Sequence, residues 1–102
     1  MKLNRVAFIF CGFGLDPKIH RTEISTGQFA LVSVGIDINH LEQSLVLAKE
    51  LVAEGVQMIE LCGGFGPIWM AKISEALGST IPVGGVFYGP EMRKPILNLL
   101  QD

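Results

Sequence analysis

Four short apolar runs constrain the fold of this sequence more than any other feature, because each is apolar at odd and even positions alike. They are Arg5–Cys11 (RVAFIFC), Phe29–Ile36 (FALVSVGI), Val56–Cys62 (VQMIELC) and Ile81–Tyr88 (IPVGGVFY). A strand with one wet face alternates apolar and polar residues, whereas the strands of a parallel sheet covered on both faces are apolar throughout. The sequence therefore predicts four strands of a mostly parallel sheet that is covered on both sides.

Two segments with helical periodicity separate the later strands. The first is predicted from about His40 to Glu54, where Asn39 can cap the helix and Glu42 completes a capping box. The second is predicted over Pro67–Leu77, since proline suits the first position of a helix. Such alternation of strands and helices is typical of α/β proteins with a parallel sheet.

The connection after the first strand and the C-terminal tail are less regular. The stretch Phe13–Gln28 contains a polar segment in which Asp16 can begin a short helix, and its Ser-Thr-Gly sequence turns the chain into the next strand. In the tail, Pro95 is expected to precede a short helix whose apolar side includes Leu99 and Leu100.

The predicted fold is a single α/β domain over residues 1–102, with a four-stranded sheet in the order 2-1-3-4, as in half of a flavodoxin-like layout. An α+β ferredoxin-like arrangement is the alternative.

The apolar content exceeds what a chain of this size easily buries. Of 102 residues, 49% are hydrophobic and only 18% are charged. Small domains bury a smaller fraction of their surface than large ones do. Leu47 and Leu51 also widen the apolar stripe of the first helix, as expected if a second subunit touches it. We therefore predict a homo-oligomer, with a symmetric dimer as the expected form.

Charge and cysteine content exclude several classes of partner. The net charge is −2 and no basic run occurs, so the sequence lacks the footprint of a nucleic-acid-binding protein. No apolar run reaches the roughly 18 residues of a membrane helix, and no membrane association is predicted. The two cysteines and two histidines lack zinc-site spacing, so no metal site is predicted and no cofactor is identified. Free thiols favour a cytoplasmic protein.

Two similar glycine-rich stretches end the first and third runs. They read Cys11-Gly12-Phe13-Gly14 and Cys62-Gly63-Gly64-Phe65-Gly66. In the order 2-1-3-4 these strands are neighbours, and the chain order reverses between them, which is where ligands bind to open α/β sheets. We predict a site for a small anion at this rim, formed by Gly12, Gly14, Gly63, Gly64, Phe65, Gly66, Tyr88 and Gly89. An equally open alternative is that the glycines only make the short turns that every α/β protein needs.

Three ionisable side chains near this rim are candidate catalytic residues. Adjacent strands lie about 4.8 Å apart, so Cys11 and Cys62 are expected to lie close together. Each is either a reactive thiol or a packing residue. Glu60 lies two positions before Cys62, and strand alternation predicts that both project from one face. A carboxylate inside an apolar strand is either a general base in a cleft or half of an ion pair.

The whole chain resembles a family of short bacterial proteins of about a hundred residues with no assigned function. Three stretches carry the resemblance: AFIF with DPKIHR after it, AKELVAEGVQMIELCGGFG at 48–66, and IPVG at 81–84. The resemblance favours an α/β domain and implies no activity.

Three hypotheses about function follow from these residues. The first is a small-ligand-binding or sensor module that works as a homo-oligomer. The second is an enzyme of the isomerase or lyase type that acts on a small carboxylate through Glu60 and a cysteine thiol. The third is a structural subunit of an assembly.

Overall fold

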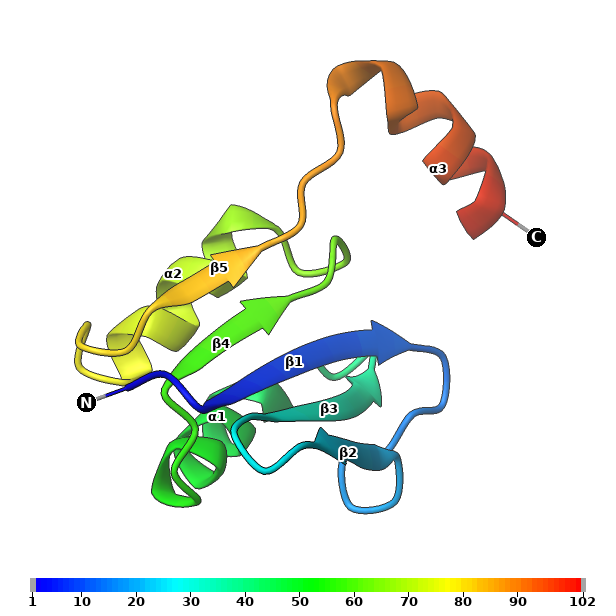
Figure 1. Ribbon diagram of the computed structural model, residues 1–102. Coiled ribbons are helices and arrows are strands. Elements are labelled where there is room, and N and C mark those ends of the chain that lie inside the picture. The colour runs from blue at the N-terminus through cyan, green and yellow to red at the C-terminus, as the bar shows by residue number, and fades with distance from the viewer. Residues whose placement is uncertain (1, 102) are drawn as a thin grey trace.

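A five-stranded mixed sheet forms the centre of the computed structural model, which describes residues 2–101 (Figure 1). The strands are β1 (Arg5–Gly12), β2 (Arg21–Ser25), β3 (Ala30–Asp37), β4 (Met58–Leu61) and β5 (Val83–Gly85). The helices are α1 (Gln43–Ala53), α2 (Gly66–Ala76), the 3₁₀ turn η1 (Pro90–Met92) and α3 (Arg93–Leu100).

The strands lie in the order β2-β3-β1-β4-β5. The pairs β1–β3, β1–β4 and β4–β5 are parallel, and β2 runs antiparallel to β3. The four strands expected from the sequence are therefore neighbours in the expected order. The prediction of only four strands was wrong, and the parallel pairs contradict the ferredoxin-like alternative.

The additional strand, β2, lies in the first connection, where the sequence allowed a short helix beginning at Asp16. Instead, the Asp16 carboxylate accepts a hydrogen bond from the Lys18 N–H at 2.9 Å, and His20 Nδ1 accepts one from the Asp16 N–H at 2.9 Å. This closed turn directs the chain into β2, and a second turn, in which the Thr26 hydroxyl accepts hydrogen bonds from two backbone N–H groups, leads into β3. The sequence of β2 is largely polar because it is an exposed edge strand.

The hydrophobic core lies between one face of the sheet and the helices α1 and α2. Alternate residues of the central strands face these helices and are almost completely buried. The core side chains are Ala7, Ile9, Val32, Val34, Ile36, Leu47, Ala48, Leu51, Val56, Ile59, Leu61, Phe65 and Ile73. Figure 1 shows both helices on the same side of the sheet, behind it in this view.

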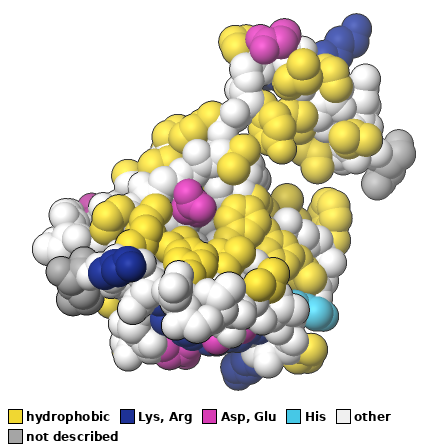
Figure 2. Space-filling view, viewed as in Figure 1, with side chains coloured by type: hydrophobic (Ala, Val, Ile, Leu, Met, Phe, Trp, Pro, Cys, Tyr) yellow, Lys and Arg dark blue, Asp and Glu magenta, His cyan; other side chains and the backbone are white. Residues whose placement is uncertain are grey.

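The opposite side of the sheet, which we call the open face, carries no helix within residues 2–101 (Figure 1). Its apolar side chains follow from the strand register: Val6, Phe8, Phe10, Ile24, Leu31 and Met58. Ile24 is 69% exposed, and Figure 2 shows hydrophobic side chains gathered across this face. The predicted cover on both sides of the sheet is therefore not found within residues 2–101, although the strands are apolar on both sides as the sequence indicated.

Two details of the helices differ from the predictions. Helix α1 begins only at Gln43, after turns at residues 38–39 and 41–42, and no side chain within residues 2–101 caps it, so the predicted capping box from Asn39 does not form. Leu47 and Leu51 pack in the core of their own chain rather than facing a second subunit.

The C-terminal helix α3 stands apart from the sheet (Figure 1). It begins at Arg93, before Pro95, because proline is tolerated in the first turn of a helix. It follows the exposed segment 86–89, and none of its residues is fully buried. No helix within residues 2–101 is long and apolar enough to cross a membrane.

The position of α2 on the core predicts the effect of two matched substitutions. Ile73 is 0% exposed and Ile68, on the same helix, is 69% exposed. Ile73→Ala is expected to lower the free energy of unfolding by about 2–5 kcal/mol, because it leaves a cavity in the core. Ile68→Ala is expected to change it by less than about 0.5 kcal/mol. Urea denaturation measures both, and equal effects would contradict this packing of α2.

Candidate functional site

The two cysteines meet where β1 and β4 end. Their sulfur atoms lie 3.6 Å apart, and the Cys11 N–H donates a hydrogen bond to the Cys62 sulfur at 3.4 Å. Both thiols are free and pack against the core between sheet and helices. The expected proximity of two cysteines 51 positions apart in the sequence is therefore confirmed.

The surroundings of Cys11 keep its thiol protonated. Burial is the largest cause that raises the pKa of this thiol to about 12, and its hydrogen bond with Cys62 acts in the same direction. Because the thiolate is the nucleophile, a thiol with such a pKa reacts slowly at neutral pH. This favours a packing role for Cys11 rather than a catalytic one.

The glycines of the rim fit tightly against other parts of the protein. A Cβ atom at Gly64 would lie 2.5 Å from the Cys11 sulfur, and one at Gly63 would overlap the ring of Tyr88. Gly14 and Gly66 have φ values of +78° and +76°, a conformation that other residues rarely adopt. Internal packing and turn geometry therefore account for glycine at these four positions.

The other predicted rim residues have different surroundings. Phe65 is 5% exposed and belongs to the core, whereas Tyr88 is 62% exposed. At Gly12 a Cβ atom would touch the Leu15 side chain at 3.0 Å, and Gly89 precedes the η1 turn.

Glu60 does not face the cysteines, contrary to the prediction. It lies between Phe8 and Gly84 in the sheet register, so its side chain is on the open face. The strand ends at Leu61, and the chain then turns, which places Cys62 against the core on the helix side. Within residues 2–101 no cation forms an ion pair with Glu60. The carboxylate and the thiols are therefore not part of one constellation.

A groove of about 840 Å³ lies beside β3, between the turn over residues 14–21 and helix α1. Its lining comes from the first connection, the end of β3, the segment before α1 and the side of α1 that faces the first connection: Gly14, Leu15, Asp16, Pro17, Lys18, Arg21, Asp37, His40, Gln43, Val46, Leu47, Glu50 and Glu54. Of the predicted ligand-binding residues, only Gly14 lines it. We call this cavity the groove.

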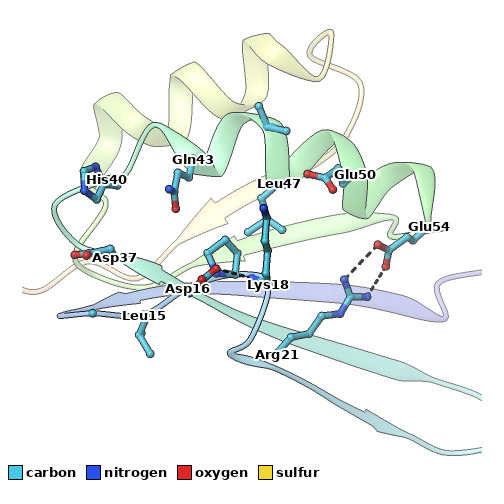
Figure 3. A pocket seen from close by; sticks show the side chains of 13 residues that line it. Leu15, Asp16, Lys18, Arg21, Asp37, His40, Gln43, Leu47, Glu50 and Glu54 are labelled. Atoms are coloured by element: carbon cyan, nitrogen blue, oxygen red, sulfur yellow. Dashed lines mark hydrogen bonds and ion pairs between the residues drawn. The ribbon is translucent and has the colours of Figure 1, made fainter.

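Charged side chains are arranged along the groove (Figure 3). Asp37, His40 and Gln43 lie at one end, and Lys18 extends toward α1 in the middle. Carboxylates outnumber the lysine and arginine groups, since Asp16, Asp37, Glu50 and Glu54 face only Lys18 and Arg21. A negative surplus in a concave site favours a ligand that carries positive charge.

An ion pair closes the other end of the groove. The two terminal guanidinium nitrogens of Arg21 donate hydrogen bonds to the Glu54 carboxylate, the one from Nη1 at 3.2 Å (Figure 3). The pair lowers the pKa of Glu54 and raises the pKa of Arg21, with the hydrogen bonds as the largest cause of each shift. Arg21 is therefore already neutralised, and Lys18 remains the groove cation that has no ion-pair partner among the described residues.

Sequence reasoning missed most of this groove because its residues come from three separate segments. The available signal was the Asp-Pro-Lys segment at 16–18, together with Asp37 at the end of an apolar run. Neither signal showed that the first connection folds back as β2 and faces α1.

Residues 4–101 of the chain match the model of DUF6506, a family of unknown function. No curated protein and no solved structure matches the chain.

The contact between Gly64 and Cys11 predicts a coupled pair of substitutions. Gly64→Ala is expected to lower the free energy of unfolding by about 1–3 kcal/mol, because its methyl group overlaps the Cys11 sulfur. Gly27→Ala is the control, since a Cβ there meets no atom within 4 Å. In a Cys11→Ala background, Gly64→Ala should lower the free energy of unfolding by less than it does in the wild type. Additive effects in urea denaturation would rule out this contact.

The raised pKa of Cys11 predicts a loss of stability in alkali. The folded protein holds the thiol proton up to about pH 12, whereas the unfolded chain loses it near the ordinary value of 9.0. The unfolded state thus binds fewer protons over this range, so the free energy of unfolding should fall as the pH rises from about 9 to 12. Cys11→Ala should show a smaller fall in denaturation measured at each pH. If the free energy of unfolding fell equally steeply with pH in the variant and in the wild type, the raised pKa of Cys11 would be contradicted.

Proposed function

Because the chain belongs to DUF6506, a family of unknown function, we propose its function from the site itself: a small-molecule-binding module that works as a homo-oligomer. The observation that carries the proposal is the groove of about 840 Å³ between the first connection and α1. Ligand sites commonly have volumes of about 300–1,000 Å³ and combine apolar walls with a few placed polar groups.

The walls of the groove supply both kinds of contact. Leu15, Val46 and Leu47 provide apolar surface, and the charged groups provide orientation. Asp37 already accepts a hydrogen bond from the Asn39 N–H at 3.0 Å, which fixes its carboxylate at the end of β3. A fixed carboxylate of this kind can hold an ammonium group without having to be ordered first.

The charges specify the class of ligand. The surplus of carboxylates favours a small molecule with an amine group, and Lys18 offers one contact for a carboxylate on the same molecule. The ligand is thus a small amine or amino acid, rather than the simple anion expected at the glycine rim.

The separation of Glu60 from both thiols weighs against the alternative of an isomerase or lyase. General acid–base catalysis needs its groups within reach of one substrate atom. Glu60 lies on the open face, whereas Cys11 and Cys62 pack on the helix side.

The proposal predicts selective stabilisation by amines. In thermal denaturation, putrescine and lysine are expected to raise the melting temperature, and succinate at the same ionic strength is expected not to. At about ten times its dissociation constant, a ligand adds about 1.4 kcal/mol, which is several degrees for a domain of this size.

Matched variants locate the binding site. Asp37→Asn and Glu50→Gln should abolish the shift, whereas Glu75→Gln, an exposed carboxylate on α2, should leave it unchanged. A shift that is the same in all variants, or one produced by succinate alone, would refute the amine site in the groove.

A further inference from the structure

The single chain exposes more surface than a monomer of its size should. Its accessible surface is 6739 Å², whereas a compact monomer of 11.1 kDa exposes about 5,650 Å². The excess of about 1,100 Å² is larger than the roughly 800 Å² that each partner buries in a standard interface. The radius of gyration, 14.1 Å, also exceeds the roughly 12.8 Å expected for this chain length. The excess surface has the size of a missing interface.

Two apolar surfaces that have no cover in the single chain contribute to this excess. The first is the open face, whose strands are apolar yet lack a covering layer within residues 2–101. The second is the apolar side of α3, where Leu97, Leu99 and Leu100 are 45%, 84% and 55% exposed. Figure 2 shows hydrophobic side chains on α3 as well as on the sheet below it. Sheets are commonly covered by helices that pack an apolar side against them. The apolar side of α3 is therefore suited to cover the open face of a sheet.

The charges of the two surfaces are complementary. Glu60 is an exposed carboxylate among the apolar side chains of the open face. Helix α3 begins with Arg93 and Lys94 and contains no acidic residue. A buried carboxylate would need such a cation beside it.

We infer that α3 of one copy packs on the open face of a second copy, and that the second copy returns the same contact. The exposed segment 86–89 leads α3 away from its own sheet and would connect it to the sheet of the second copy. Such reciprocal exchange gives a closed two-fold dimer. The inference specifies the homo-oligomer of the proposed function and does not depend on what the groove binds.

Sedimentation of wild type and variants tests this dimer. At micromolar concentration, the wild type is expected at about twice 11.1 kDa. Leu99→Asp on α3 and Ile24→Asp on the open face should each give a folded monomer, as checked by circular dichroism. Ile68→Asp, an equally exposed position on α2, is the control and should remain dimeric.

The remaining outcomes separate other arrangements. A monomeric wild type would overturn the inference, because α3 would then fold on its own sheet or leave the open face to another partner. A dimer that persists in Leu99→Asp would overturn it too, because the two copies would meet elsewhere. Groove binding is read separately from thermal shifts with putrescine, so failure of the dimer and failure of the ligand site are distinguishable.

The charge pairing has its own test. Glu60→Lys places a cation opposite Arg93 and Lys94 and is expected to raise the dimer dissociation constant about tenfold, whereas Glu60→Gln should raise it less. An unchanged constant in Glu60→Lys would overturn the placement of α3 over Glu60.

Discussion

A largely parallel sheet needs cover on both faces, and within residues 2–101 helices pack on only one of them. The constraint arises because the central strands β1, β3 and β4 are apolar at successive positions, so exposing either side of the sheet to water raises the free energy of the folded protein. Helices α1 and α2 bury most of the side chains that β1, β3 and β4 direct to one side. The open face and the apolar side of the detached helix α3 are the two surfaces that no other element within residues 2–101 covers.

The rim where β1 and β4 end shows how close packing can imitate a ligand site in a sequence. Glycines and cysteines gather there, as in many binding loops. Their positions are explained by contacts within the protein, since the Cys11 sulfur and the Tyr88 ring occupy the space where Cβ atoms of Gly64 and Gly63 would lie. A glycine that admits a neighbouring side chain and one that admits a ligand look alike in a sequence. Only the tertiary neighbours distinguish the two.

The groove owes its existence to the edge of the sheet. Beside the edge strand β2, the turn over residues 14–21 and helix α1 face each other across a space that no helix within residues 2–101 fills. The Arg21–Glu54 ion pair links the two walls. The turn before the polar edge strand forms most of this wall of the groove, and Arg21 is the residue that β2 itself adds to the lining.

The sequence by itself determined the four apolar strands, their parallel order and the meeting of Cys11 with Cys62, because these follow from local patterns and from the rules of α/β connection. Local patterns did not reveal β2, whose polar residues form a strand only through their hydrogen bonds to β3. Tertiary structure alone decided that Glu60 turns away from the thiols, because the strand ends one residue before Cys62. Tertiary structure alone also decided which side of the sheet each helix covers. An apolar strand sequence indicates that both faces need cover, but it does not indicate which element provides it.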